Sequence, residues 1–225
     1  MIIYGKQPIL YLLKNHRDKI EKIFLSKEID KKIFHQIKDI PIERVDTKKA
    51  QGMARGGNHQ GFLAQVKEIE TLFYGDLIKK NSFVLILHGV TDVGNIGGII
   101  RTAYSLGVEG VIISGIQNIS FSGIARSSSG AVFDMPLSIH KNILDILNEA
   151  KQIGFKTYGA SADGTDVREV EFPEKRVLVV GSEGEGIPNR ILKSLNKKVA
   201  VSMERDFDSL NVSVATGILI DRMRV

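Results

Sequence analysis

The sequence predicts an α/β protein built on a mainly parallel sheet and preceded by a smaller α/β module. From Ser82 onward, short aliphatic runs of strand length alternate with amphipathic runs of helix length. Strands that are aliphatic throughout are typical of parallel sheets covered by helices on both faces. The positive charge is uneven: residues 1–67 hold 14 Lys and Arg against 7 Asp and Glu, whereas residues 68–225 hold 17 against 19. This asymmetry favours an N-terminal module that meets a polyanion, although a solvated basic surface explains the charge equally well.

The N-terminal module is expected to span residues 1–67. Pro8 is typical of a first helical turn and opens a helix over residues 9–15. Thr47 is the expected N-cap of a later helix. The other expected elements are a strand over 20–26, a helix over 29–37, a short strand after Pro41, a helix over 48–53, a glycine loop at 55–58 and a strand over 61–66.

Residues 68–81 are expected to form a linker, and residues 82–225 the larger domain. The linker combines a polar stretch with a short helix that ends at Lys80. The expected strands of the larger domain are 83–87, 110–114, 137–140, 155–160, 176–180 and 198–203, and the expected helices are 96–106, 123–133, 143–153, 188–195 and 210–223.

The composition excludes several classes of protein. The chain has no Cys, which excludes disulfides and Cys-based zinc sites, and its 5 His lack the spacing of metal ligands. Residues 1–10 contain no apolar signal-peptide core, and the longest aliphatic runs are strand-sized. We therefore expect a soluble, cytoplasmic protein that uses no metal.

Three unusual loops follow expected strands, where open parallel sheets bind their ligands. They are Gly94–Gly98 followed by Arg101, Gly181–Gly186, and Met203–Asn211. Neither glycine cluster matches a dinucleotide fingerprint or a P-loop. Glu183 and Glu185 would also repel phosphates. The loops therefore predict a neutral or cationic ligand.

Each polar residue of these loops, taken singly, also has a purely structural explanation. Arg101 at the edge of the apolar helix face can be a surface arginine. Asn95 can be a helix N-cap, Ser209 can be another, and Glu183 can be a first-turn acid favoured by the helix dipole.

Together, these residues resemble the three ordered motifs of the SpoU/TrmH family of RNA 2′-O-ribose methyltransferases, in the SPOUT superfamily. The motifs are Asn95-x-Gly97-x-x-x-Arg101, Gly181–Gly186 and Ser209–Ala215. Further similarity lies at Ser128–Ala131 with Pro136, at Tyr4-Gly5 and at His59–Gly61. The layout is most similar to bacterial 23S rRNA guanosine 2′-O-methyltransferases. The third motif departs from the family because its strand lacks the usual Pro and following Gly, and it adds charges at Glu204, Arg205, Asp206 and Asp208.

The resemblance implies a fold, a methyl donor and a site. The fold has a C-terminal trefoil knot and, before it, a ribosomal-protein-like RNA-binding domain, and the enzyme works as a homodimer with the active site near the interface. The donor is S-adenosylmethionine, which the resemblance assigns to Gly159, Gly181, Val201, Leu210 and Asn211. The polar site residues carried over are Arg101, Asn95, Glu183, Ser209 and Asn211. Because a guanidinium is a poor base, we expect Arg101 to pair with an RNA phosphate and to stabilise charge on the ribose oxygen.

The basic N-terminal domain is expected to bind structured RNA, and rRNA is the RNA that we expect first. Arg55, Asn58, His59 and Gln60 are candidate contacts with a splayed RNA loop, and a mobile turn is the alternative. Rival functions are the same chemistry on tRNA or another rRNA site, a non-catalytic RNA-binding ribosome-assembly factor, and a nucleotide-dependent oxidoreductase. The missing dinucleotide fingerprint disfavours the last of these.

Overall fold

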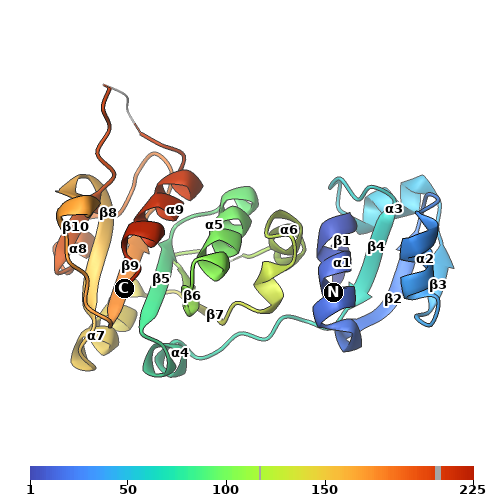
Figure 1. Cartoon of the computed structure of the whole chain (residues 1–225), viewed down its shortest axis with the longest axis horizontal. Coiled ribbons are helices and arrows are strands. Elements are labelled where there is room, and N and C mark those ends of the chain that lie inside the picture. Colours follow the sequence, from blue (N-terminus) through green and yellow to red (C-terminus); the bar gives the residue numbers. More distant parts are fainter. Residues whose placement is uncertain (117, 206–208) are drawn as a thin grey trace. The chain divides into compact units, whose positions relative to one another are not determined.

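The structure is a computed structural model that describes residues 1–116, 118–205 and 209–225 (Figure 1). The chain forms two compact units. The first unit combines Met1–Ile69 with Ser120–Asp134, and the second combines Glu70–Ile119 with Met135–Val225. Residues 120–134 lie within the domain expected over 82–225, but they pack in the first unit.

The first unit is built on a four-stranded sheet in the order β1-β4-β2-β3. Strand β4 (Phe62–Val66) runs antiparallel to β1 (Ile2–Tyr4) and to β2 (Ile20–Leu25), which pairs in parallel with β3 (Ile42–Arg44). The helices are α1 (Lys6–Asn15), η1 (Arg17–Lys19), α2 (Lys31–Ile37) and α3 (Thr47–Met53), joined by α6 (Phe121–Ser127) and η2 (Ala131–Phe133) of the second segment. Strand β1 has no counterpart among the predicted elements.

Aspartates cap the two short helices α2 and α3, and Thr47 is not an N-cap. The Asp46 carboxylate accepts a hydrogen bond from the Lys49 N–H at 2.7 Å, so Thr47 is the first helical residue of α3 and not its N-cap. Asp30 caps α2 in the same way through the Lys32 N–H. These bonds satisfy backbone donors that a first helical turn leaves unpaired.

One carboxylate ties the 120–134 segment to α1. The Tyr11 hydroxyl donates to Asp134, and the His16 Nε2 lies 2.7 Å from Asp134 Oδ1. The His16 and Asp134 side chains are each only 23% exposed, so this contact is sheltered from water. Asp134 is therefore the polar anchor of a segment that is distant from α1 in sequence.

The second unit confirms the predicted parallel sheet. Its strand order is β10-β8-β9-β5-β6-β7, and every pairing is parallel. The strands are β5 (Phe83–His88), β6 (Gly110–Ser114), β7 (Leu137–His140), β8 (Lys156–Asp166), β9 (Arg176–Val180) and β10 (Lys197–Ala200). The helices are α4 (Tyr74–Lys80), α5 (Val93–Ser105), α7 (Ile143–Gln152), η3 (Val167–Glu169), α8 (Asn189–Leu192) and α9 (Val212–Arg222).

Helices cover both faces of this sheet. Leu77 of α4, Ile146 of α7 and Ile191 of α8 pack in one core with Val84 and Val177 of the sheet. The alternate strand residues face the opposite side, where α5 and α9 pack against each other (Figure 1). Within the described residues, no helix is long and apolar enough to cross a membrane.

The strand order also positions a site. The chain proceeds from β5 to β6 and β7 in one direction, then returns to place β8 and β9 on the other side of β5. The order therefore reverses between β5 and β9. In open parallel sheets, ligands bind beyond the carboxyl ends of the strands at such a reversal.

We predict that Asp134→Ala destabilises the protein by about 1–3 kcal/mol, because it removes the sheltered carboxylate that the Tyr11 hydroxyl and the His16 ring both contact. Urea unfolding measures this loss. The matched control is Asp39→Ala, which removes the ion pair between Asp39 and Arg17 from a carboxylate that is 65% exposed. That change should cost at most about 1 kcal/mol. Equal losses in the two variants would contradict the anchoring role of Asp134.

Candidate active site at the reversal of the strand order

A pocket of about 750 Å³ opens beyond the carboxyl ends of the strands in the second unit. Its walls are the middle of β8, the turn after β9, the end of β10 with the segment that follows it, and the start of α9. The lining residues are Ala160–Ala162, Val180–Gly186, Val199–Val201, Met203, Ser209–Val212, Ala215, Thr216 and Leu219. Of the residues expected to hold the donor, Gly181, Val201, Leu210 and Asn211 line this pocket.

Gly159 does not line the pocket. A Cβ at this position would lie 2.5 Å from Leu195 Cδ1 and 3.3 Å from side-chain atoms of Ile187 and Leu192. The residue therefore gives room for the packing of the segment around α8. The wall that we expected from Gly159 is supplied instead by the three residues that follow it, Ala160–Ala162.

The turn after β9 requires glycine at position 181. A Cβ there would lie 2.1 Å from the Gly186 carbonyl carbon, closer than any real Cβ contact. The turn closes through the Gly186 N–H, which donates to the Ser182 carbonyl at 3.0 Å. Gly181 thus allows the chain to fold back on itself and to expose backbone atoms to the pocket.

Three polar side chains from the segments that follow three different strands, β5, β9 and β10, meet beside this turn. Asn95 Nδ2 donates to Glu183 Oε1 at 2.9 Å, and Asn211 Nδ2 donates to the same oxygen at 3.0 Å. Asn211 Nδ2 also lies 3.1 Å from Asn95 Oδ1. We call Asn95, Glu183 and Asn211 the polar triad. The structure therefore brings together three of the five predicted polar site residues.

Helix caps orient the two amides of the triad. Asp92, and not Asn95, caps α5 by accepting from the Asn95 N–H at 2.7 Å, which leaves the Asn95 side chain for Glu183. Asn211 caps α9, because its Oδ1 accepts from the Ser213 N–H at 2.9 Å. With Oδ1 engaged in the cap, Nδ2 of Asn211 must face Glu183. A single side chain thus begins α9 and completes the triad.

The structural explanations of Asn95, Ser209 and Glu183 do not hold. Asn95 is not the N-cap of α5, and Ser209 is not the N-cap of α9. Glu183 lies in the turn after β9, before α8 begins at Asn189, so it is not a first-turn helical acid. Asp92 could have been found from the sequence, because an aspartate three residues before Asn95 is typical of an N-cap.

Arg101 and Ser209 lie outside the triad. Ser209 is exposed and lines the pocket. Arg101 has an exposed side chain on α5, six residues and therefore roughly 9 Å along the helix axis beyond Asn95. Glu204 and Arg205 are exposed, whereas Asp206 and Asp208 lie outside the described residues.

The four predicted RNA contacts of the first unit divide into two kinds. Arg55, Asn58 and Gln60 are exposed, whereas His59 is only 6% exposed. The His59 Nδ1 accepts from the Gly61 N–H at 3.0 Å, and the Gln60 Oε1 accepts from the Lys6 N–H at 3.1 Å. His59 is thus turned into the protein and orders the loop, while its neighbours present their side chains to solvent.

The chain is similar to known proteins over nearly its whole length. Residues 82–221 match the model of the SpoU rRNA Methylase family, and residues 2–72 match that of RNA 2′-O ribose methyltransferase substrate binding. YacO of Bacillus subtilis, assigned to the TrmH family of tRNA/rRNA methyltransferases, is 31% identical over 97% of this chain and 92% of that protein. The 23S rRNA (guanosine-2′-O-)-methyltransferase RlmB of Haemophilus ducreyi is 30% identical over 97% of this chain and 94% of that protein.

Solved structures share the fold. An rRNA methyltransferase from Sinorhizobium meliloti, solved with bound AdoMet, superposes with a TM-score of 0.77 at 22% identity, covering 99% of this chain and 86% of that chain. The SpoU methyltransferase AviRb from Streptomyces viridochromogenes, also in complex with AdoMet, superposes with a TM-score of 0.79 at 21% identity. The match covers 99% of this chain and 88% of that chain.

We predict that Gly181→Ala destabilises the second unit by about 1–3 kcal/mol, since the added methyl group meets backbone that has no room to move. The control is Gly98→Ala on α5, where the new Cβ would lie 3.7 Å from Ser213 Cβ, an ordinary contact. Because Ala favours helix over Gly, that variant should be as stable as the parent or more stable, by up to about 1 kcal/mol. Thermal unfolding of both variants measures these changes in stability. An unchanged unfolding temperature in Gly181→Ala would show that the turn is not tightly packed.

Proposed function

The chain belongs to the SpoU rRNA methylase family, and we propose that it transfers a methyl group from S-adenosylmethionine to a ribose 2′-hydroxyl of structured RNA. The observation that carries this proposal is the polar triad beside the pocket. Asn95, Glu183 and Asn211 come from the segments that follow three different strands and share hydrogen bonds of 2.9–3.1 Å. An assembled polar set next to a pocket of ligand size is typical of a catalytic site.

The pocket fits the methyl donor. Backbone atoms of the turn at Gly181–Gly186 and of the segment through Val201 line the pocket and can hold a ligand, and Gly181 permits the tight turn that presents them. Glu183 and Glu185 in the lining suit a positively charged sulfonium and oppose a polyphosphate. When bound, S-adenosylmethionine supplies a methyl group that the sulfonium charge has already activated. We assign its binding to Gly181, Val201, Leu210 and Asn211.

The protein's own residues then have to orient the ribose hydroxyl and help to remove its proton. The hydrogen bonds of the triad hold the Glu183 carboxylate in one position, and well-oriented placement can contribute roughly 7–11 kcal/mol to a reaction of this kind. In this proposal Arg101 pairs with an RNA phosphate and stabilises the negative charge that develops on the ribose oxygen. Ser209 lines the pocket and is assigned to orientation of the site. The proton leaves through a neighbouring group or water.

We propose a guanosine of 23S rRNA as the target, in the cytoplasm. The support is the 30% identity to an enzyme named for that target, over almost the whole of both chains. The basic charge of residues 1–67 suits the RNA backbone. There are two alternatives. One is the same chemistry on tRNA or another rRNA site, and the other is a non-catalytic ribosome-assembly factor. The triad favours an enzyme, because a factor that only binds RNA has no use for it.

We also propose the knot and the homodimer that the family resemblance implies. The pocket lining brings the segments 199–203 and 209–212 to the turn at 181–186, which is the arrangement that a knotted C-terminal segment needs. Val214 and Ile218 are 51% and 36% exposed, and both lie on one side of α9. Tyr104, at the end of the adjacent helix α5, is 43% exposed. These apolar side chains are the proposed dimer contact.

Methyl transfer is tested with radiolabelled S-adenosylmethionine and unmodified 23S rRNA and tRNA transcripts, followed by mapping of 2′-O-methyl ribose. We expect label at one ribose of one RNA. Arg101→Ala should lower turnover by about 10²-fold or more, whereas Arg190→Ala on α8, across the sheet, should not. Wild-type turnover in Arg101→Lys would rule out a role that needs the planar guanidinium. RNA binding without label on transcripts or on assembled particles would favour the assembly factor.

The dimer is tested with Val214→Glu, which places a charge on the proposed contact. Sedimentation velocity should show a dimer for the parent and a monomer for the variant, since burying an unpaired carboxylate is unfavourable. Val225→Glu is the control, because this terminal residue is 84% exposed. A parent that sediments as a monomer at micromolar concentration would refute the proposal.

A further inference from the structure

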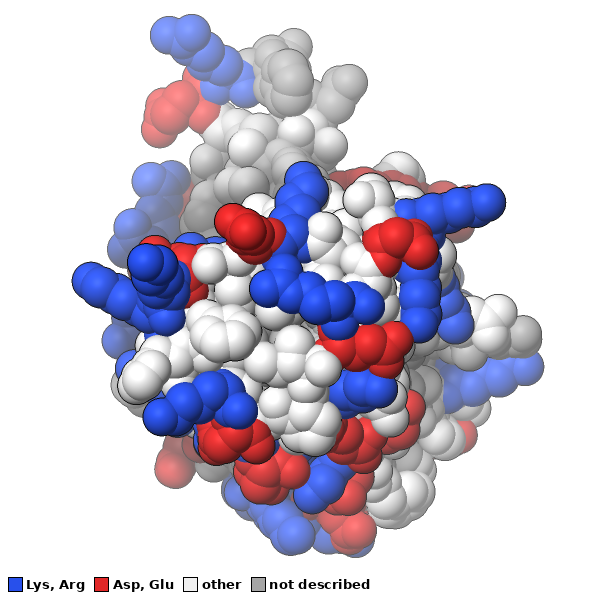
Figure 2. All heavy atoms as spheres, turned by 90° about the vertical axis from the view of Figure 1, so that its right-hand side faces the viewer, with Lys and Arg blue, Asp and Glu red and all other residues white. Residues whose placement is uncertain are grey.

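The cations of the first unit are not equally available to a polyanion. Lys22 and Lys49 both bind Glu43, at 2.6 and 2.7 Å, and Arg17 pairs with Asp39. The hydrogen bonds from Lys22 and Lys49 lower the pKa of Glu43 to about 2, so these pairs persist at neutral pH. On the face shown in Figure 2, acidic side chains are interleaved with basic ones. The positive charge counted from the sequence is therefore partly neutralised within the protein.

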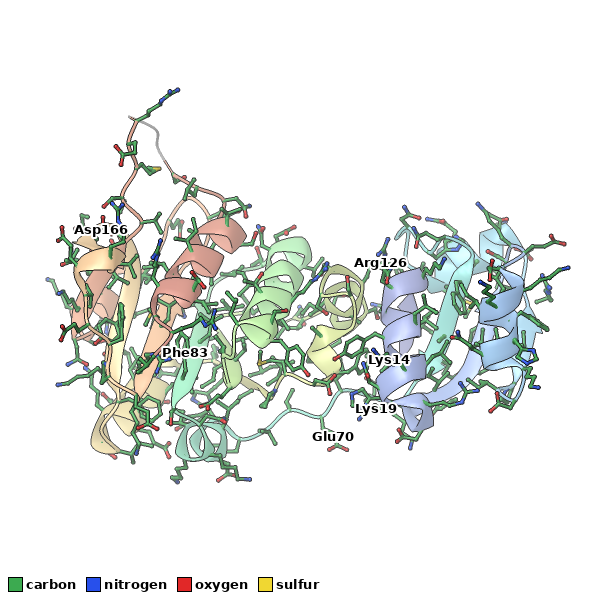
Figure 3. All side chains as sticks on the ribbon, viewed as in Figure 1. Lys14, Lys19, Glu70, Phe83, Arg126 and Asp166 are labelled. Carbon is green, nitrogen blue, oxygen red and sulfur yellow. The ribbon has the colours of Figure 1, made fainter. Side chains whose placement is uncertain are left out.

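Arg126 of α6 differs from these residues. Its side chain is half-buried and lies over Gly5, where a Cβ would be only 2.6 Å from Arg126 Nε (Figure 3). Among the described residues, none forms a hydrogen bond or an ion pair with its side chain. A partly buried guanidinium without a carboxylate lacks the pairing that usually offsets its lost hydration. Its planar fork of donors matches a phosphate.

Two further cations, Lys6 and Lys27, are connected to Arg126 through contacts of Gly5 and of the 55–61 loop. Lys6 follows Gly5, and its N–H donates to Gln60 of the 55–61 loop. The side chain of Lys27 packs on the backbone of Gly61, at the end of the same loop. Lys6 and Lys27 are exposed, and neither pairs with a carboxylate in the part of the chain that the structure describes. Glu28, the acid next to Lys27, is exposed.

The loop between these cations is held in one shape. Arg55 and Gln60 have positive φ angles of 49° and 55°, which are uncommon for residues with side chains. Buried His59 holds the following turn through the Gly61 N–H at 3.0 Å. A loop that is ordered before binding loses less conformational entropy when it meets its partner. His59 is thus a positioning residue, and its exposed neighbours Asn58 and Gln60 can contact a ligand.

We propose that this surface binds the sugar-phosphate backbone of the RNA substrate and that Arg126 supplies one of its phosphate contacts. The loop face is defined by Lys6, Lys27, Arg55, Asn58, Gln60 and Arg126. Arg126 comes from the segment that matches the methylase model, yet it extends the surface of the substrate-binding part of the chain. This inference rests on the proposed function, because it takes RNA as the substrate.

The test compares the two ends of helix α1. The double variant Lys6→Gln/Arg126→Gln removes two charges from the loop face. Lys14→Gln removes one exposed charge near the other end of α1 (Figure 3), roughly 12 Å from Lys6 along the axis. Binding of a labelled, unmodified 23S rRNA transcript is measured from about 50 to 200 mM salt. Each lost phosphate contact should lower the magnitude of the negative slope of log affinity against log salt by about 0.7–0.9, and the slopes below are given as magnitudes.

We therefore expect the slope to fall by about 1.4–1.8 in the double variant and to stay at the parental value in Lys14→Gln. Arg126→Lys keeps the charge and should keep the slope. Equal slopes in the double variant and in Lys14→Gln would overturn the inference. The single variant Arg126→Gln is measured beside Arg126→Lys, and equal lowering of the slope by the two would also overturn the inference, since packing and not charge would then be responsible. Equal thermal unfolding of all variants excludes misfolding as the cause.

Methyl transfer separates this inference from the proposed function. In the double variant, the KM for RNA should rise while kcat at saturating RNA is retained, because these residues do not touch the reacting atoms. If the parent shows the expected salt dependence but transfers no methyl group, the proposed function fails and the loop face stands. If the parent transfers methyl groups and the double variant keeps the parental KM and slope, the loop face fails and the function stands.

Discussion

The site depends on the meeting of three segments at the carboxyl edge of one sheet. Asn95 and Asn211 are 116 residues apart in the chain, and Glu183 lies between them in sequence. They meet because the strand order reverses between β5 and β9, which brings the ends of strands distant in sequence to the same place. The hydrogen bonds of Asn211 then join the start of α9 to this edge. The wall of the pocket, the start of the last helix and the polar triad are therefore parts of one arrangement.

The sequence predicts the parallel sheet well, because residues such as Val84–Leu87 are aliphatic on both faces and have few alternatives to a buried strand. The sequence predicts strands poorly where pairing with a residue distant in the chain determines whether a strand forms. Strand β1 has only three residues, and its ladder with β4 joins positions about 60 residues apart. Strand β8 was expected to end at Ala160, but its polar end stays in the sheet because Thr165 and Asp166 pair with β10 after a register shift. Likewise, no local pattern shows that residues 120–134 pack on α1.

The candidate site was predictable in its residues but not in its contacts. The motifs locate Asn95, Glu183 and Asn211, yet Asn95 and Glu183 also had local structural explanations. Only the observed caps decide between them: Asp92 takes the cap of α5, and Asn211 both caps α9 and reaches Glu183. The environment of Gly159 was also beyond prediction, because it depends on Leu192 and Leu195, more than 30 residues away. His59 resembles a ligand contact in the sequence, and its burial is a property of the folded loop.

The split composition of the first unit affects the order in which the protein folds during synthesis. Residues 1–69 include all four strands of that unit. The segment 120–134, which contacts α1 through Asp134, ends 65 residues after residue 69. At roughly 5–20 residues per second, the ribosome needs about 3–13 s to make this stretch. During that interval the nascent N-terminal part lacks Asp134, which Tyr11 and His16 contact in the folded unit. The first unit is therefore completed only after synthesis of the second has begun.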